Sequence, residues 1–310
     1  MGTSSQLVFH GQDPRLFQPI STRKIIENYY LRTIAPYIAY EHGFQGAAID
    51  LYTACSSSGV AVIQACKELS LNQCDMAIAG GISINLPQEV GYLFTENGIL
   101  SDDGHCRPFD ISASGTVMSN GAGLIVLKRY EDALANNDFI HAVIIGYGMN
   151  NDANLKTGFM APGINGQYSC IHSAWKNAGI QPNDLDYIET HGTATQLGDP
   201  IEIYALKKAC QSFNMTVPCP VGSVKSNIGH TIIASGMAAI IKTVLMLQHR
   251  AIAPSVNFQT LNPNIILEDT PLYIATHYQE FAKTKKYFTA GVSNFGLGGT
   301  NTHIVLQTSY

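Results

Sequence analysis

The residue best suited to nucleophilic chemistry is Cys55, in the hexapeptide TACSSS of residues 53–58. An apolar run before it predicts a strand over residues 47–52, and the pattern after it predicts a helix over residues 56–69. Backbone N–H groups and the positive end of the helix dipole favour a thiolate at such a junction. The same N–H groups could hold an oxyanion formed by attack on a thioester carbonyl. The alternative is an inert buried thiol, because cysteine is among the most frequently buried residue types.

Two histidines occupy similar positions further along the chain. His191 directly follows a strand predicted over residues 185–189 and lies in a turn of small residues. His230 comes after a strand predicted over residues 221–224 and before an apolar helix predicted over residues 234–249. Open α/β sheets place functional side chains where strands end, so both imidazoles are candidates to act with the cysteine. The alternative is a surface or structural role, because the chain contains ten histidines.

Neither a metal nor a phosphate-binding loop is indicated. The two histidines lack the short local spacing of zinc ligands and a third candidate ligand. The glycine-rich segment of residues 291–303 lacks the G-x-x-x-x-G-K-[ST] pattern of a phosphate-binding loop. It predicts a tight hairpin between strands over residues 288–292 and 302–306, whose glycines supply unusual backbone angles. Its bare backbone could also approach a substrate closely and donate an N–H group.

The elements that must position these residues alternate between strand and helix. Residues 47–52, 56–69 and 76–79 predict a βαβ unit, and therefore a parallel sheet with a right-handed crossover. The helix of this unit is apolar nearly all round, so we expect it in the interior. A loop-rich stretch over residues 82–120 and a strand over residues 123–128 follow.

The same alternation resumes in the second part of the chain, which suggests an internal duplication at the level of architecture. The first 46 residues are the least informative. Besides the elements named above, we expect a helix over 21–40 interrupted near Pro36, strands over 142–146 and 185–189, and helices over 166–179 and 200–210.

Composition narrows the class of protein. The 310 residues are 45% hydrophobic, which is enough for a sizeable core, and only 13% are charged, with a net charge of -5. Nucleic acid is therefore an unlikely partner. The seven cysteines form no C-x-x-C pair and no signal peptide is recognised, which favours reduced thiols in the cytoplasm. The longest apolar stretch, residues 232–241, is shorter than the roughly 20 residues of a membrane span, so no membrane segment is expected.

Together these motifs resemble a β-ketoacyl synthase, the condensing domain of polyketide and fatty acid synthases. The likeness is closest to modular polyketide or mixed polyketide/peptide synthases, and it covers most of residues 28–308. The segments follow the family's order and rough spacing: TACSSS (53–58), CDMAIAGG (74–81), GILSDDGHCRPFD (98–110), GAGLIVLKR (121–129), ETHGTATQLGDPIE (189–202), GSVKSNIGH (222–230) and GVSNFGLGGTNTHIVL (291–306).

The resemblance implies an α/β fold of the thiolase-like kind, with α-β-α-β-α layers built from two related halves. Residues 1–135 would form the half that carries the nucleophile, and residues 136–310 the half that carries the catalytic histidines. The family begins with an N-terminal region that includes its first central strand. We expect this region to be missing here, so that the first half is incomplete.

The resemblance also implies a role for each catalytic residue. Cys55 would accept an acyl group from a carrier-protein phosphopantetheine thioester. His191 and His230 would promote decarboxylation of a malonyl-carrier thioester and stabilise the enolate, which attacks the acyl group. Lys225 would order the two histidines electrostatically.

The implied substrate contacts come from two segments. Thr193 and Thr195 would hydrogen-bond the pantetheine arm, and the backbone N–H groups of the cysteine and Leu297 would form the oxyanion hole. Phe295 and Asn301, on either side of the glycine-rich turn, would also belong to the substrate site. Leu297 stands where the family often has a phenylalanine gate. The segment HGTAT replaces the usual HGTGT and adds one methyl group at Ala194.

By the same resemblance the protein would be an acyltransferase of the β-ketoacyl synthase type, active in the cytoplasm without a cofactor or metal. Its partners would be an acyl carrier protein, a second copy in a homodimer, and other synthase domains. The alternative is a non-catalytic, truncated remnant or assembly subunit that keeps the dimer and carrier-protein surfaces.

Overall fold

The computed structural model describes residues 33–86, 88, 90–96, 98–181, 183–281 and 285–309. The chain divides into two units between Asp50 and Leu51. The first unit contains helix α2 (Ile34–His42), which ends at Gly43 in a left-handed conformation, φ 69°. Pro36 lies in the first turn of α2, where its missing N–H leaves no helical bond unmade. The part of the predicted helix before residue 33 lies outside the described residues.

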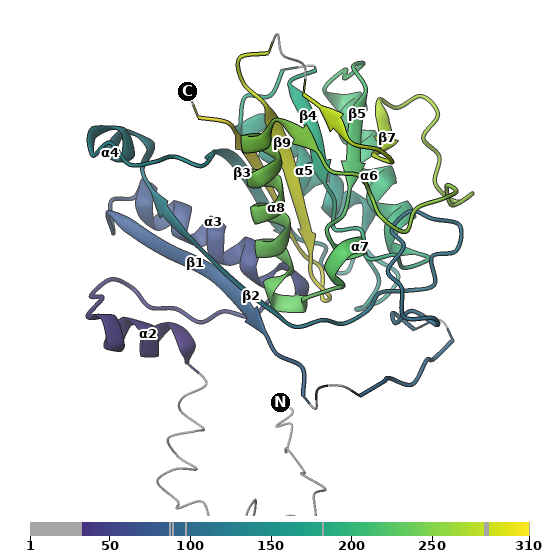
Figure 1. The fold of residues 1–310 in the computed structure, drawn as a ribbon, viewed down its shortest axis with the longest axis horizontal. Coiled ribbons are helices and arrows are strands. Elements are labelled where there is room, and N and C mark those ends of the chain that lie inside the picture. Colours follow the sequence, from purple (N-terminus) through teal and green to yellow (C-terminus); the bar gives the residue numbers. More distant parts are fainter. Residues whose placement is uncertain are drawn as a thin grey trace, which may run out of the picture. The chain divides into compact units, whose positions relative to one another are not determined.

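The second unit is organised around a mixed sheet of six strands (Figure 1). Its order is β3-β10-β9-β4-β5-β7, with β9, β4, β5 and β7 mutually parallel and β10 antiparallel to both of its neighbours. The strands are β3 (Val143–Asn151), β4 (Leu185–Glu189), β5 (Cys219–Gly222), β7 (Leu272–Ile274), β9 (Thr289–Phe295) and β10 (Thr300–Gln307). The predicted hairpin around the glycine-rich turn is confirmed as β9–β10.

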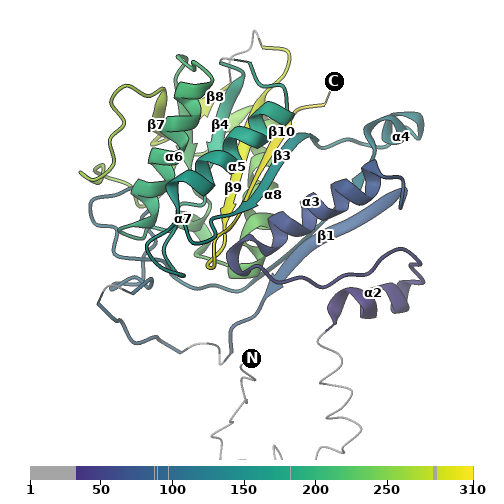
Figure 2. The ribbon, with the colours of Figure 1, turned by 180° about the vertical axis from the view of Figure 1, so that it is seen from behind.

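Helices cover both faces of this sheet (Figures 1 and 2). Helices α5 (Ile164–Asn177) and α6 (Gly198–Ser212) pack on one face, and α3 (Ser57–Ser70) and α8 (Ser235–His249) on the other. Strand β10 shows why both faces are buried. Its consecutive residues Ile304, Val305 and Leu306 are all apolar and enter the two cores alternately, as the two-residue period of a strand requires. The predicted alternation of strands and helices is confirmed here.

Helices α3 and α8 also contact a second sheet on their far side (Figure 1). This sheet is a two-stranded antiparallel ribbon of β1 (Met76–Ser83) and β2 (Gly121–Lys128). The successive layers are therefore helix, sheet, helix and sheet, an α/β fold. No residue of α3 before Ser70 is exposed, which confirms its predicted interior position.

One helical stretch is long and apolar enough to cross a membrane. It runs over Ile232–His249, has a mean hydropathy of 1.5 and is 50% buried. Its residues Met237, Ala239 and Ile240 are almost fully enclosed between the two sheets. Its apolar composition is therefore accounted for by packing inside the protein.

The predicted βαβ unit is wrong. Residues 47–52 form no strand, and β1 pairs antiparallel with β2 rather than with a parallel neighbour. An apolar run becomes a strand only when another strand accepts its backbone hydrogen bonds, and none of the described strands pairs with this run. The segment that precedes Cys55 has no regular secondary structure.

Short elements complete the second unit. They are the 3₁₀ turns η2 (Ala54–Ser56) and η3 (Ile232–Ala234), helices α4 (Tyr130–Ala135) and α7 (Lys225–Ile228), and a small ribbon of β6 (Ala251–Ile252) and β8 (Gln279–Glu280).

Candidate active site

A sharp turn presents Cys55 at the start of α3. Ala54 has φ 54°, a left-handed conformation that is costly for a residue with a side chain. Two serines of the TACSSS motif hold this turn with their hydroxyls. Ser56 Oγ donates to Thr53 O at 2.9 Å, while Ser57 Oγ accepts from Thr53 N at 2.9 Å and donates to Ala54 O at 2.7 Å. The serines therefore stabilise the strained backbone that positions the thiol.

The β9–β10 turn reaches this cysteine from the other half of the chain. A Cβ atom at Gly296 would overlap Thr53 O and Ser56 Oγ, so only glycine allows the approach. The backbone N–H groups of Leu297 and Cys55 both act to lower the pKa of the thiol, as donors close to the sulfur do. The pair of N–H groups predicted as an oxyanion hole is thus brought together.

The thiolate predicted at Cys55 is not favoured. Burial is the largest influence and raises the pKa of the thiol, although Lys225 and the two backbone N–H groups act to lower it. The N–H groups at the helix start favour the charged thiolate. The sulfur is also buried, however, and burial disfavours the charged form. Burial therefore favours the protonated thiol.

The main chain of His191 is held at both ends by buried charges. Its N–H donates to Glu202 Oε1 at 2.7 Å, and its carbonyl accepts from Lys225 Nζ at 2.6 Å. Burial, followed by the charge of Lys225 and by His230, lowers the pKa of His191 far below its usual value. The imidazole is therefore neutral at physiological pH, and Lys225 acts through a hydrogen bond as well as through its charge.

His230 is neutral for the same reasons. Burial and the charge of Lys225 lower its pKa to about 3. Its Nδ1 accepts a hydrogen bond from Ile232 N at 3.3 Å, which places the ring proton on Nε2. Its main chain pairs with the segment before β2, because His230 N donates to Val117 O at 2.6 Å. His230 therefore offers a fixed N–H donor.

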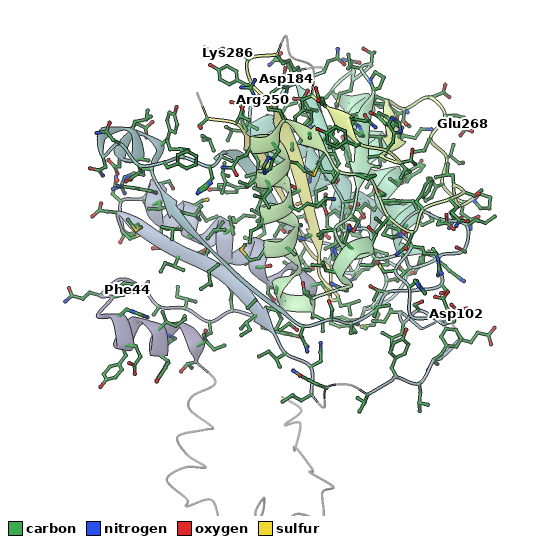
Figure 3. All side chains as sticks on the ribbon, viewed as in Figure 1. Phe44, Asp102, Asp184, Arg250, Glu268 and Lys286 are labelled. Carbon is green, nitrogen blue, oxygen red and sulfur yellow. The ribbon has the colours of Figure 1, made fainter. Side chains whose placement is uncertain are left out.

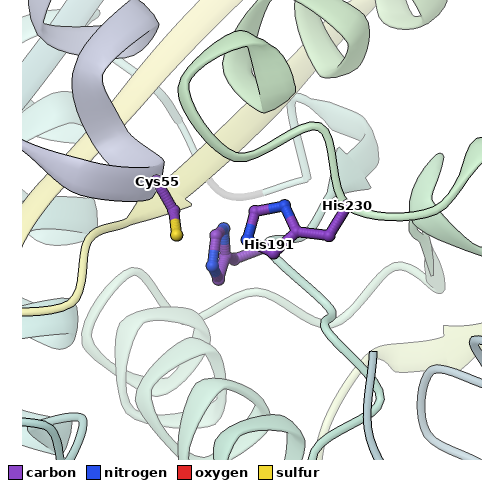
Figure 4. Close-up of side chains that lie close together, drawn as sticks. All are labelled: Cys55, His191 and His230. Atoms are coloured by element: carbon purple, nitrogen blue, oxygen red, sulfur yellow. The ribbon is translucent and has the colours of Figure 1, made fainter. Parts of the chain in front are cut away.

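Cys55, His191 and His230 meet at one point (Figure 4). Their ligand atoms all lie within 4.8 Å of one another, and the two imidazole rings meet edge to face with centroids 5.6 Å apart. The sequence argument that a third zinc ligand is missing is therefore wrong, because the fold supplies the cysteine. The protonation of His230 nevertheless favours donation over metal ligation, since a ligating Nε2 must give up its proton.

Two buried carboxylates, which the sequence argument did not single out, organise the histidine segment. Glu202 also accepts from Gly192 N at 2.8 Å, and Asp199 accepts from Phe109 N at 2.7 Å and Ala194 N at 3.1 Å. Burial raises the pKa of both carboxyl groups to about 7. Ala194 has φ 61°, so Asp199 holds a residue in a conformation that favours glycine. The signal in the sequence was their spacing of three residues at the start of α6, which puts both on one face.

A third carboxylate links the two histidine turns. Glu189 is fully buried, and its Oε1 accepts from Val224 N at 2.6 Å, directly before Lys225. Its Oε2 accepts from Tyr187 and Lys242, each at 2.7 Å. The end of β4 is thereby fixed to the segment that follows β5.

A cavity of about 870 Å³ opens onto the three reactive side chains. Thr193 and Thr195 line it, with their hydroxyls 3.1 Å apart. Phe295 also lines it, with its ring centroid 5.8 Å from that of His191. Leu297 and Asn301 complete the set of predicted substrate residues along its wall. All five are in place beside the reactive residues, and their contacts with a substrate stay predictions.

Asn301 is largely engaged by the protein itself. Its Nδ2 donates to Asp152 Oδ1 at 2.7 Å and to Asn150 Oδ1 at 3.1 Å. Leu297 is 37% exposed at the cavity wall. Of the predicted site residues, Lys225 alone does not line the cavity, because it lies beneath His191.

Two parts of one family match this chain. The model described as "Beta-ketoacyl synthase, N-terminal domain" matches residues 5–133, and "Beta-ketoacyl synthase, C-terminal domain" matches residues 141–259. The chain belongs to the β-ketoacyl synthase family. Homologous ketosynthases are acyltransferase-type condensing enzymes of polyketide synthesis.

Similar proteins include polyketide synthases. The chain is 43% identical over 276 residues to a subunit of the phenolphthiocerol/phthiocerol polyketide synthase of Mycobacterium tuberculosis, a match of 88% of the chain and 18% of that protein. It is 39% identical over 277 residues to polyketide synthase PksN of Bacillus subtilis, with 89% and 5% covered. The chain thus spans less than a fifth of these proteins.

Solved ketosynthases share the fold. Ketosynthase twelve of the bacillaene polyketide synthase of Bacillus amyloliquefaciens matches with a TM-score of 0.91 and 35% identity, over 96% of this chain and 54% of that one. The ketosynthase from module 6 of the bacillaene synthase of B. subtilis matches with a TM-score of 0.84 and 40% identity, over 89% and 50%. The predicted thiolase-like α/β fold is confirmed, and the chain spans about half of each solved ketosynthase. The boundary between halves at residues 135 and 136 stays a prediction.

Proposed function

We propose that this chain is a β-ketoacyl-carrier-protein synthase that joins a Cys55-bound acyl group to a malonyl-carrier thioester. The observation that carries the proposal is the convergence of a thiol, two neutral imidazoles and two backbone N–H donors on one cavity. A nucleophile, donors for developing negative charge and space for two thioesters are what this condensation needs.

In the first step the Cys55 sulfur attacks the carbonyl of an acyl thioester. The new S–C bond forms as the carrier's C–S bond breaks, and the thiol proton leaves on the carrier's sulfur. The N–H groups of Cys55 and Leu297 stabilise the oxyanion of the intermediate. The protonated cysteine of the resting site suits this exchange, because the proton is needed by the leaving group.

In the second step a malonyl thioester loses CO₂, and its electron pair becomes the enolate of an acetyl thioester. Neutral His191 and His230 donate hydrogen bonds to the enolate oxygen without protonating its carbon. The enolate carbon attacks the acyl-Cys55 carbonyl, and the C–S bond to Cys55 breaks. The product is a β-ketoacyl thioester on the carrier, and the Cys55 thiolate takes up one proton from solvent.

The partners follow from this chemistry. Thr193 and Thr195 hydrogen-bond the phosphopantetheine arm of an acyl carrier protein, which brings both substrates and makes a separate cofactor unnecessary. A homodimer with neighbouring synthase domains, working in the cytoplasm, fits the polyketide synthase relatives. Seven free cysteines agree with a reducing compartment.

The test is acylation by a small acyl-pantetheine thioester, followed by intact-mass measurement and peptide mapping. We expect one acyl group on wild type, located on Cys55, and none on Cys55→Ala. Cys106→Ala is the matched control, because that thiol is also buried but does not line the cavity. An unmodified wild type, or equal labelling of Cys55→Ala, would refute the proposal and favour the non-catalytic alternative.

A further inference from the structure

Gln167 is a buried polar residue on the cavity wall that the condensation steps do not use. It is 2% exposed and lies on the face of α5 that also carries the buried Cys170, Ile171 and Ala174. These positions follow the helical repeat, so their side chains point to the same side of the helix. An apolar side chain would suit this face, and a buried amide there needs a hydrogen-bonding partner.

The protein itself does not satisfy the amide of Gln167. Its Oε1 is fully enclosed and has no hydrogen-bond partner among the described residues. Of the cavity-lining residues that the structure describes, only His191 shares this property, at Nδ1. By contrast, Asp102 also lines the cavity, but it is exposed at the surface (Figure 3) and accepts from Ser114 Oγ. An unpartnered amide in the wall of a cavity indicates a ligand that supplies the missing hydrogen bonds.

The fold places Gln167 at the same edge of the sheet as Thr193 and Thr195. Strands β3 and β4 run in the same direction, because β10 is antiparallel to β3 and β9, and β9 is parallel to β4. Helix α5 follows β3, α6 follows β4, and both cover one face of the sheet (Figure 2). The two helices therefore begin at one edge, and the threonines lie in the segment between β4 and α6.

The backbone that carries Gln167 is fixed. Asn150 Nδ2 donates to Gly166 O at 2.8 Å, and a Cβ at Gly166 would overlap Asp152 Oδ1, so the start of α5 packs directly against the end of β3. Gln167 N donates to Gly163 O at 3.1 Å. A fixed backbone limits the ordering that the side chain must undergo when it binds a ligand.

We infer that the side-chain amide of Gln167 hydrogen-bonds an amide group of the pantetheine arm. The inference rests on the proposed function and adds a contact to those of Thr193 and Thr195. A carboxamide offers a carbonyl acceptor and N–H donors, which match the N–H and C=O of an amide in the arm. Gln167 thereby selects thioesters carried on pantetheine over thioesters without amide groups.

The first test is the unfolding of Gln167→Met in urea, without substrate. Methionine is close to glutamine in size, and replacing an unpartnered buried amide by an apolar side chain is neutral or stabilising. We expect the midpoint of unfolding to equal or exceed that of wild type. A lower midpoint would show that the amide holds the fold together, and it would overturn the inference.

The second test compares two thioesters of the same acyl group. One is carried on pantetheine, and the other on a thiol of equal length in which ether links replace the amides. Acylation of Cys55 is followed by intact mass at several concentrations of each. Gln167→Met should lower the ratio of the two acylation efficiencies about tenfold, because the arm loses a hydrogen bond. Gln211→Met, at an exposed glutamine of α6, should keep the wild-type ratio.

The outcomes separate this inference from the proposed function. A wild type that neither thioester acylates refutes the proposed function and the inference with it. A wild type that is acylated, together with an unchanged ratio in Gln167→Met, would overturn the inference alone. An equal loss of efficiency for both thioesters would assign Gln167 a structural role, which also contradicts the inference.

Discussion

The turn that presents the cysteine and the turns that present the histidines are held by different kinds of group. Around Cys55 the backbone is fixed by the neutral hydroxyls of Ser56 and Ser57. Around His191 it is fixed by two buried ionisable groups, Lys225 and Glu202. The thiol and the imidazoles lie close together, but the groups that hold their turns in place differ in kind.

The difference separates two tasks. In the proposed function, a thiol that takes and releases an acyl group needs a rigid turn, which hydroxyls supply without adding charge. The two imidazoles are kept neutral first by burial and then by the charge of Lys225, and both lower the pKa of His191 and of His230. The ionisable groups that make the site respond to pH should therefore be those around the two histidines.

The largest effect should come from Lys225→Met. Lys225 is 1% exposed, and its removal would leave the His191 carbonyl and nearby carboxylates without their cation. Loss of one partner from such a buried group costs about 3–5 kcal/mol. We expect this loss in the free energy of denaturant unfolding. Lys176→Met, at an exposed lysine, is the control, and an equally large loss there would show that Lys225 has no special role.

Gly296→Ala should push the β9–β10 turn away from the turn that carries Cys55. The added methyl group would overlap backbone and side-chain atoms of the Cys55 turn. Overpacking of this kind costs about 1–3 kcal/mol, and acylation should slow with it. Gly158→Ala is the control, because nothing lies within 4 Å of its Cβ position. Normal acylation and unfolding of Gly296→Ala would contradict the described contact.

Glu202→Gln should change the pH dependence of stability. The pKa of Glu202 is raised from 4.5 to about 7, so the folded state holds its proton more tightly than the unfolded state does. The stabilising effect of that proton is complete below about pH 4 and is lost as pH rises through about 7. The variant does not titrate.

The stability of Glu202→Gln relative to wild type should therefore improve as pH rises from about 4.5 to about 7. The measurement is the free energy of urea unfolding at several pH values. Glu268→Gln, at an exposed carboxyl group, serves as the control. A constant difference across this window would contradict a raised pKa at Glu202.

Ser57→Ala should have the smallest effect, and one that does not vary with pH. It removes two hydrogen bonds of a buried hydroxyl, which costs about 1–2 kcal/mol. The neighbouring Ser58 is equally buried, but its hydroxyl has no hydrogen-bond partner among the described residues. Ser58→Ala should therefore be nearly neutral in thermal unfolding, and equal losses for the two variants would contradict the hydroxyl account.

Much of the fold could be predicted because its signals are local. The strand Leu185–Glu189 was predicted with its observed bounds, and the interior helix after Cys55 within one residue. Residues 47–52 have the same kind of apolar run but form no strand. Whether a run becomes a strand depends on a distant partner, and the sequence of the run carries no record of that partner.

The sequence predicted which side chains meet at the site, but not the buried residues that hold their backbone in place. Cys55, His191 and His230 were found because their residue types can do chemistry and each follows an apolar run. Glu202 and Asp199 read as ordinary acidic residues at a helix start, and their importance appears only when burial and backbone contacts are known. Burial also reversed the expected pKa shift of the cysteine.

The most direct test of the account is a single-turnover condensation. Protein carrying an acyl group on Cys55 is mixed with a malonyl-pantetheine thioester, and CO₂ and the β-ketoacyl thioester are quantified. Wild type should release one of each per acyl group. His191→Ala and His230→Ala should keep the acyl group and condense about 10² to 10³-fold more slowly. Condensation by both histidine variants at the wild-type rate would contradict the account.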